Sequence, residues 1–347
     1  MSAGYQAALE GVAVAARPDR ARARVTGRDP VAMLQGILTN SVPAAPTPAG
    51  SPGVTRGRAA YSAILTPKGR MVADLRVVRG PRGDDQGLLL DLPTGALAGL
   101  LAHLGRYLPP RFAKTDDVSG ALAQITVAGP GGAALLSRDA LGLRVETAEL
   151  DALGEGDWLW VDSGGEGVLI VRSADLDATA FDLFAERATA DALARNAVAA
   201  GAAELNAAAL EALRIEAGRP AWGADLDEET IPPEAGIDGR AIDHGKGCYT
   251  GQEVIVRLRD RGHVNRHLRA LRFDGEAPLP ERGAELWVEG KDRPVGSVTS
   301  AAASPRAGSV GLGWVRREVD VPAELRVGGP DGPRAQALAA TTGWWRG

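Results

Sequence analysis

Cysteine is almost absent from this chain of 347 residues, which has only Cys248. A single thiol forms no disulfide within the chain, and this fits a reducing compartment such as the cytoplasm. It also holds no iron–sulfur cluster alone, because such a cluster takes about four cysteine-type ligands. Cluster chemistry at Cys248 would therefore need ligands from a partner or a second subunit. The four histidines do not recur at ligand spacing with acids or cysteine, so no metal site is predicted.

Long apolar runs are also missing. No stretch reaches the roughly 18 to 20 apolar residues that a membrane helix needs. The first residues lack the basic-then-apolar order of a secretion signal. We therefore expect a cytoplasmic protein with no membrane partner. The net charge of −5 argues against nucleic-acid binding through bulk electrostatics.

Positive charge gathers in residues 240–272, where eight Lys and Arg residues stand against three acids. This excess could attract a polyglutamyl tail, a nucleic acid or an acidic partner. No aromatic residues alternate with the arginines, so few side chains could stack on bases, and nucleic acid would bind only weakly. A solvated strand face is at least as good an interpretation.

The pattern of apolar and turn-forming residues predicts α+β structure in two or three domains. The first part is predicted to hold a helix at 29–38 capped by Asp29, a surface loop at 42–57, strands at 59–65, 71–78 and 87–92, and a leucine-rich helix capped by Thr94. A ferredoxin-like unit follows from Arg111 to Gly201, with elements at 122–127, 132–140, 157–161, 167–171 and 177–200. A helix at 206–217 precedes a loop-rich run. The last six predicted strands indicate a small antiparallel barrel: 270–273, 285–288, 296–300, 310–315, 324–327 and 335–339.

The segment at 242–253 gathers the rare residue types of the chain. It contains the single cysteine, one of the four lysines, a histidine and a tyrosine, separated by glycines that let the backbone approach a ligand closely. Lys246 and His244 lie near Cys248 in the sequence, and nearby cations favour the thiolate form of a cysteine. The alternative is a loop whose cysteine merely fills space, as most lone cysteines do.

The sequence KGCYTGQE at 246–253 resembles the signature of the YgfZ family, relatives of the glycine-cleavage T-protein that support iron–sulfur enzymes. Segments within 25–40, 61–74 and 213–236 resemble stretches of the wider T-protein superfamily, in the same order. The resemblance implies a three-domain ring around a central cavity that binds a tetrahydrofolate or a one-carbon derivative.

The domains that follow from the resemblance and the patterns can be placed on the chain. We expect residues 1–110 plus 202–265 to form a discontinuous folate-binding domain. Residues 111–201 would form the ferredoxin-like middle domain, and residues 266–347 the C-terminal antiparallel β-barrel.

Two residues are candidates for chemistry. Cys248 would be the functional thiol, and Asp74 matches the aspartate that T-proteins use to help transfer the one-carbon unit. A carboxylate near the folate nitrogens could steer or accept a proton. For Asp74, the alternative is an acid that caps a turn or ends a strand.

Other residues are candidates for holding the folate. Glu234 matches the acid that meets the pterin in T-proteins, where a carboxylate accepts two hydrogen bonds from the amino group and a ring N–H. Lys246 and Arg257 are expected to pair with the glutamate tail. The remaining predicted contacts come from the same motif: Tyr249, Gln252 and Glu253. Solvent-exposed charges are the alternative for the charged members of this set.

Three functions remain open. The first is an accessory protein that binds tetrahydrofolate and supports the assembly or repair of iron–sulfur client enzymes. The second is a folate-dependent aminomethyltransferase, and the third is a folate-dependent demethylase or a dehydrogenase-linked domain of the same fold family. A dinucleotide-binding turn at 127–134 is a weaker alternative, because Pro130 removes a donor from the phosphate turn. A tight strand-to-helix turn explains that segment better.

Overall fold

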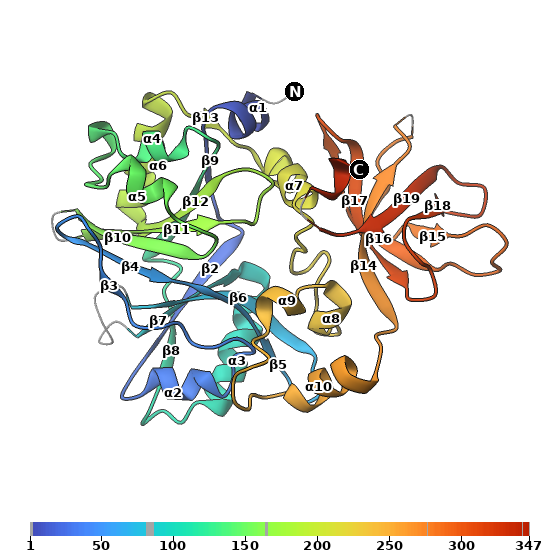
Figure 1. The fold of residues 1–347 in the computed structure, drawn as a ribbon, viewed down its shortest axis with the longest axis horizontal. Helices are drawn as coiled ribbons and strands as arrows, with labels where there is room; N and C mark the ends of the chain where they lie inside the picture. The colour runs from blue at the N-terminus through green and yellow to red at the C-terminus, as the bar shows by residue number, and fades with distance from the viewer. Residues whose placement is uncertain (1–2, 81–86, 164–165, 276, 342, 347) are drawn as a thin grey trace.

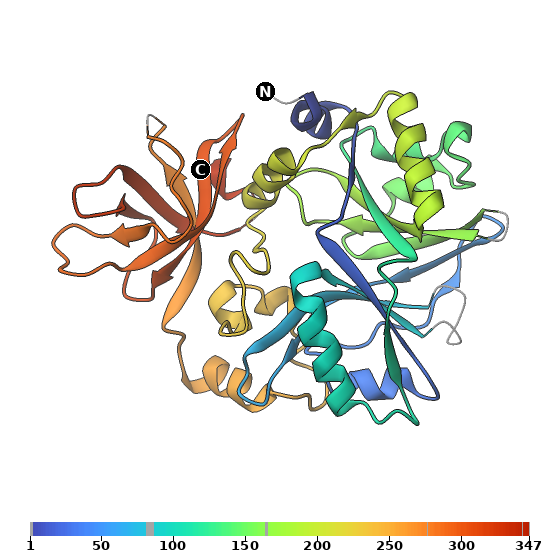
Figure 2. The same ribbon diagram turned by 180° about the vertical axis from the view of Figure 1, so that it is seen from behind.

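Three lobes meet around a central region in the computed structural model (Figures 1 and 2). The structure describes residues 3–80, 87–163, 166–275, 277–341 and 343–346. An eight-stranded sheet, a five-stranded sheet and a closed six-stranded barrel form the lobes. The predicted mixed α+β fold with a C-terminal barrel is confirmed.

The five-stranded sheet lies in the blue and cyan lobe of Figure 1. Its strands follow in the order β5 (Ala60–Leu65), β6 (Met71–Arg79), β7 (Leu88–Pro93), β2 (Arg20–Thr26) and β8 (Lys114–Asp117). Its helical segments are α2 (Pro30–Gln35), the short 3-10 helix η2 (Thr94–Ala96) and α3 (Leu97–Tyr107). Asp29 caps α2 as predicted, through the backbone N–H of Ala32. Thr94 starts the 3-10 helix and does not cap α3 with its side chain.

One face of this sheet carries a row of polar side chains. Ala73, Leu75 and Val77 of β6 face the core shared with α3, and Asp74 and Arg76 alternate with them on the opposite face. Arg76 lies in register beside Asp91 of β7, which lies beside Arg22 of β2. Tyr61 of β5 flanks Arg76 on the other side. The sheet thus presents acids and cations to the space between the lobes.

The eight-stranded sheet lies in the second lobe, covered by helices on its outer side (Figure 1). Its strand order is β13 (Ala203–Glu204), β1 (Ala13–Ala16), β9 (Leu122–Ala128), β12 (Ala180–Glu186), β11 (Glu166–Ser173), β10 (Asp157–Ser163), β4 (Val54–Arg58) and β3 (Thr47–Pro48). The helices of this lobe are α1 (Ala3–Glu10), α4 (Gly132–Leu136), η3 (Asp139–Leu141), α5 (Thr147–Asp151) and α6 (Arg187–Ala199). Strands β1, β3, β4 and β13 join this sheet from outside 111–201, and the domain boundaries stay a prediction.

The predicted helix at 177–200 is wrong in its first part, because residues 180–186 form β12. This strand is buried on both faces, with Phe181 in one core and Phe184 in another. Such a strand lacks apolar–polar alternation, so its pattern does not distinguish it from a buried helix. The predicted loop at 42–57 also contains structure, since β3 and most of β4 fall within it and β4 pairs with β10.

The turn between β9 and α4 is the expected strand-to-helix turn. Strand β9 pairs antiparallel with both neighbours, β1 and β12. A dinucleotide fingerprint needs a parallel βαβ unit, so that alternative is wrong here. Glu149 stands in the sequence about where the ribose-binding acid of such a fingerprint would be, and it accepts a hydrogen bond from the Ser51 hydroxyl at 2.9 Å.

The C-terminal lobe is the barrel shown in orange and red in Figure 1. Its strands close in the order β14 (Arg266–Phe273), β17 (Gly308–Arg316), β16 (Gly296–Ser304), β15 (Glu285–Trp287), β18 (Ala323–Val327) and β19 (Arg334–Ala339). Each of the six predicted strands is present. Short β-branched or apolar runs separated by turn residues are a local signal in the sequence, and this signal was sufficient to predict the barrel strands.

The remaining helices connect the lobes: α7 (Ala207–Glu216), α8 (Pro232–Ala235), α9 (Asp238–Ala241), α10 (Gln252–Arg261) and η4 (Trp344–Arg346). Arg306 of the barrel pairs with buried Glu216 of α7 and with Asp177 at 2.8 Å. Trp344 donates its indole N–H to the carbonyl of Ile215 at 2.9 Å. The barrel is thereby fixed against α7. Among the described helices, none combines the length and apolar character needed to span a bilayer.

Candidate ligand-binding cavity

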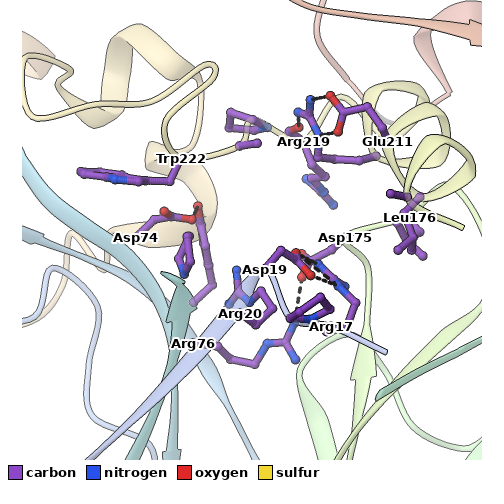
Figure 3. A pocket seen from close by; sticks show the side chains of 18 of the residues that line it. Arg17, Asp19, Arg20, Asp74, Arg76, Asp175, Leu176, Glu211, Arg219 and Trp222 are labelled. Atoms are coloured by element: carbon purple, nitrogen blue, oxygen red, sulfur yellow. Dashed lines mark hydrogen bonds and ion pairs between the residues drawn. The ribbon is translucent and has the colours of Figure 1, made fainter. Parts of the chain in front are cut away.

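A cavity of about 600 Å³ opens where the lobes meet. We call it the central cavity. Its walls come from the turn between β1 and β2, from β5 and β6, from the loop before β12, and from α7 and the loop that follows it. Figure 3 shows Asp74 and Trp222 together on one side and Leu176 on the opposite side. One end of the cavity therefore carries an aromatic ring and a carboxylate, and the rest of its lining is both polar and apolar.

Asp74 is the predicted catalytic residue that the structure places in this cavity. Its side chain is buried, and Tyr61 donates a hydrogen bond to its Oδ2 atom at 3.1 Å. Its Oδ1 atom is buried and has no hydrogen-bond partner among the described residues. Burial raises the pKa of Asp74, and Arg20 opposes that rise. An unpaired buried carboxylate oxygen is costly unless a ligand pairs with it.

The floor of the cavity is a network of ion pairs between the two sheets. Arg20 pairs with Asp91 at 2.9 Å within the five-stranded sheet. Arg76 reaches across to Asp182 of β12 and to Asp175, at 2.8 Å each. Burial alone would raise the pKa of Asp175, but Arg76 and Arg240 hold it below its ordinary value. These pairs fix the relative position of the two sheets beneath the cavity.

The opposite wall comes from α7 and the loop after it. Arg214 pairs with Asp225 at 2.8 Å and donates to the Ser300 hydroxyl of the barrel at 2.9 Å. Arg219 donates through Nε to the carbonyl of Ala174 at 3.0 Å. Its two terminal nitrogens have no hydrogen-bond partner within the described part of the chain. Burial lowers the pKa of Arg219, while Asp175 and Glu155 act in the opposite direction from beyond ion-pair distance.

The other predicted site residues lie outside this cavity. Glu234 sits on α8 and pairs with Arg266 of the barrel at 3.2 Å. Glu253 and Arg257 pair with each other on the exposed face of α10 at 2.6 Å. Gln252 begins the same helix and donates its backbone N–H to the Tyr249 carbonyl. None of these residues lines the central cavity.

The motif loop is held by Lys246, whose ammonium donates to three backbone carbonyls. These belong to Gln35, Leu38 and Asn40, at 2.9, 2.6 and 2.9 Å. The same ammonium lies 5.6 Å from the centre of the buried Tyr249 ring. Lys246 is thus engaged in fixing the loop to the segment after α2.

Cys248, in contrast, is exposed. The backbone beyond it turns at Gly251, where φ is 84° and an added Cβ would lie 2.6 Å from the Thr66 carbonyl oxygen. Two of the segments that carry the family resemblance therefore pack directly on each other. No group of three or more His, Cys, Asp or Glu side chains in the described residues is placed to hold a metal ion.

Several cavity residues were not identified from the sequence: Tyr61, Arg20, Arg76, Arg219 and Trp222. A signal was present in β6, where an acid and an arginine interrupt a run of apolar residues. Charged side chains in a strand that is otherwise buried are uncommon unless they are paired or functional. The same signal marks Asp182 in β12.

The comparison with known families identifies the chain. Residues 2–246 match the GCVT N-terminal domain, and residues 266–339 match the glycine cleavage T-protein C-terminal barrel domain. The chain belongs to the glycine-cleavage T-protein family. Family membership accounts for the order of the lobes and for the predicted relation to folate-binding proteins.

Curated relatives fall into two groups. The aminomethyltransferase of Rubrobacter xylanophilus is 28% identical over 295 residues, covering 85% of this chain and 73% of the relative. The mitochondrial iron–sulfur cluster assembly factor IBA57 homolog of Mycosarcoma maydis is 25% identical over 317 residues, covering 84% and 68%. A crystal structure of glycine cleavage system aminomethyltransferase T from Bartonella henselae has the same fold, with a TM-score of 0.79 at 20% identity over 98% of this chain and 88% of that chain.

Proposed function

We propose that this protein binds a tetrahydrofolate in the central cavity and supports the assembly or repair of iron–sulfur enzymes through Cys248. The observation that carries the proposal is the separation of the two features. The unpaired oxygen of Asp74 lines a cavity, whereas the thiol is exposed on a fixed outer loop. A binding site and an exposed thiol at different places suit an accessory protein.

The cavity suits a reduced pterin. The free carboxylate oxygen of Asp74 accepts a hydrogen bond from an amino group or ring N–H. Trp222 lies on the same side and offers an apolar surface to a flat ring (Figure 3). Arg219 supplies a guanidinium group for an acidic end. All three residues line the same cavity.

The thiol suits a partner at the protein surface. Lys246 fixes the loop and Tyr249 anchors it in the core, while Cys248 stays exposed. One thiol cannot bind a cluster alone, so the client or assembly protein must supply the other ligands. The YgfZ-like motif and the likeness to an assembly factor support this half of the proposal.

A titration tests the folate half. Purified protein is titrated anaerobically with tetrahydrofolate by calorimetry, and Asp74→Asn is expected to weaken binding about tenfold or more, because a charge-assisted hydrogen bond is lost. Asp151→Asn, an exposed acid at the end of α5, is the matched control and should bind like wild type. No binding by the wild type would overturn the proposal.

The ligand contacts predicted for six residues remain predictions: Glu234, Lys246, Tyr249, Gln252, Glu253 and Arg257. The same titration with Glu234→Ala tests the first of them. The loss of folate affinity should be small if Glu234 only forms its ion pair with Arg266, and large if the pterin contacts Glu234 on α8.

A genetic test addresses the thiol. Cys248→Ala is introduced into a host that lacks the native gene, and the activity of its iron–sulfur enzymes is measured. We expect the variant to fail to restore that activity although it accumulates to the wild-type level. Full restoration by Cys248→Ala would exclude the role assigned to this thiol.

Asp74 also favours a second candidate function, a folate-dependent aminomethyltransferase. A carboxyl group with a raised pKa and a free oxygen in a ligand cavity is suited to proton transfer. Incubation with aminomethylated lipoyl carrier protein and tetrahydrofolate tests it. Release of ammonia with formation of methylene-tetrahydrofolate, lost in Asp74→Asn, would establish the transferase; absence of both products would exclude it.

A further inference from the structure

The connection between β11 and β12, residues 174–179, forms part of the wall of the central cavity, and we call it the cavity loop. Asp175 and Leu176 of this loop line the cavity. Leu176 lies on the side opposite to Asp74 and Trp222 (Figure 3). None of the six loop residues belongs to a helix or strand. The shape of this part of the wall therefore depends on the bonds that the loop makes with other elements.

Two of these bonds come from residues that line the cavity themselves. Arg219 donates through Nε to the carbonyl of Ala174 at 3.0 Å. Arg76 of β6 donates to the Asp175 carboxylate at 2.8 Å. The next side chain, Leu176, is apolar and forms no hydrogen bond of its own. Its place in the wall is therefore set by the residues on either side of it.

The following residue, Asp177, is held by the barrel and by the C-terminal end of the chain. Trp345 of η4 donates its indole N–H to the Asp177 Oδ2 atom at 2.8 Å, and Arg306 of the barrel donates to the same atom at 2.8 Å. Arg306 also donates to the backbone carbonyl of Asp177 at 3.1 Å, and Arg346 lies 3.2 Å from its carboxylate. The Asp177 amide donates to the Leu213 carbonyl of α7 at 3.0 Å. Asp177 is thus fixed by both its side chain and its backbone.

Helix η4 is attached to α7 as well as to the cavity loop, beside which the C-terminal end lies (Figures 1 and 2). Trp344 is buried and donates its indole N–H to the carbonyl of Ile215 at 2.9 Å. The guanidinium groups of Arg306 and Arg346 lie 4.3 and 4.8 Å from the centre of the Trp345 ring. Cations at such distances from an aromatic ring are attracted to it. The Trp345 ring and its N–H are therefore both engaged, and η4 connects α7, the barrel and the cavity loop.

We propose that η4 is a strap that positions the cavity loop, and that Trp345 is a positioning residue for ligand binding in a cavity that it does not line. Trp345 and Arg306 hold Asp177, and Asp177 places Leu176 in the wall. The apparent affinity of a ligand falls in proportion to the fraction of molecules whose binding site is in place. This inference rests on the proposed folate binding and adds a remote determinant of its affinity.

Hydrogen exchange without ligand tests whether η4 holds the loop. Trp345→Phe removes the indole N–H and retains an aromatic ring beside the two arginines. We expect the amides of 174–179 to exchange about tenfold faster in this variant, as the loss of one hydrogen bond to a charged group provides. The Asp177 amide, which is bonded to the Leu213 carbonyl, is the direct reporter. Trp345→Ala also removes the ring and should give a larger increase.

A titration tests whether the position of the loop matters to the ligand. Tetrahydrofolate is titrated anaerobically into each protein by calorimetry, and Trp345→Phe should bind about threefold to tenfold more weakly than wild type. Saturating tetrahydrofolate should slow the exchange of the loop amides in Trp345→Phe back towards the wild-type rate, because a ligand stabilises the state that binds it. A general loss of stability would not produce protection that depends on ligand and is confined to this loop.

Trp287→Phe is the matched control. Trp287 of β15 donates its indole N–H to the Glu285 carboxylate at 3.1 Å, so the substitution removes the same kind of bond outside the central cavity. This variant should keep the wild-type exchange of the cavity loop and the wild-type affinity for tetrahydrofolate. Thermal melting without ligand checks that each variant is folded.

The outcomes separate this inference from the proposed function. Unchanged exchange of the cavity loop in Trp345→Phe would overturn the strap, whatever the titration gives. Faster exchange with unchanged affinity for tetrahydrofolate would overturn the positioning role of Trp345. If the wild type binds no tetrahydrofolate while the loop exchanges faster in Trp345→Phe, the strap is supported and the proposed function fails.

Discussion

Lys246 offers the sharpest test of how the motif loop is built. We predict that Lys246→Met lowers the free energy of unfolding of the region around the loop by about 2 to 3 kcal/mol. Methionine retains the apolar stem but cannot donate to the carbonyls of Gln35, Leu38 and Asn40. Three hydrogen bonds from a half-buried ammonium, each contributing about 1 kcal/mol, give the magnitude. Loss of the cation–π contact with Tyr249 adds to it.

Hydrogen exchange is the suitable assay, because the loss is local and the chain has several lobes. At pH 7 the ammonium is charged, since burial lowers its pKa only to about 8. Amides of 35–41 and 246–251 should exchange about 30-fold to 150-fold faster in the variant. Lys291→Met, at an exposed lysine of the barrel, is the control. Equal protection in wild type and Lys246→Met would refute the structural role of Lys246.

Two further predictions concern charged groups. Because burial raises the pKa of Asp74, its folded form binds a proton more readily than its unfolded form, so its contribution to stability falls as pH rises through the folded pKa. Asp74→Asn should therefore raise the melting temperature at pH 7 while it weakens folate binding, and the gain in melting temperature should shrink at acidic pH. Arg306→Met should lower the free energy of unfolding by about 3 kcal/mol in urea, because it leaves the buried Glu216 without its cation. A change below about 0.5 kcal/mol would contradict that role.

The sequence identified those parts of the fold whose signal is local. The barrel strands, the capped helix at Asp29 and α7 each carry their own turn or cap residues. Strand β2 was missed because it alternates arginine with alanine, a pattern that resembles a polar segment. The structure explains it: Arg20 meets Asp91 from the neighbouring β7, a partner 71 residues away. A pairing at such a distance leaves no mark in the local pattern.

The candidate site likewise contains residues that the sequence predicted and residues that it did not. Asp74 was predicted from the family resemblance and lies in the central cavity, whereas Arg219 lines the same cavity and was not predicted. Its place in the cavity depends on which segments the folded chain brings together, and the local sequence carries no sign of that. The roles of Cys248 and Glu234 remain predictions, because their positions alone do not assign a ligand.

The cavity wall and the thiol loop are joined by the short segment that follows α2. Asn40 donates from its side-chain amide to the carbonyls of Tyr61 and Arg240, at 3.0 and 3.2 Å. The carbonyl of the same residue accepts from Lys246, at 2.9 Å. Asn40 thus contacts the wall on one side and the anchor of the Cys248 loop on the other. The central cavity and the loop that carries the exposed cysteine are therefore linked through one residue, because Asn40 bonds the backbone of two cavity-lining residues and the lysine that holds the loop.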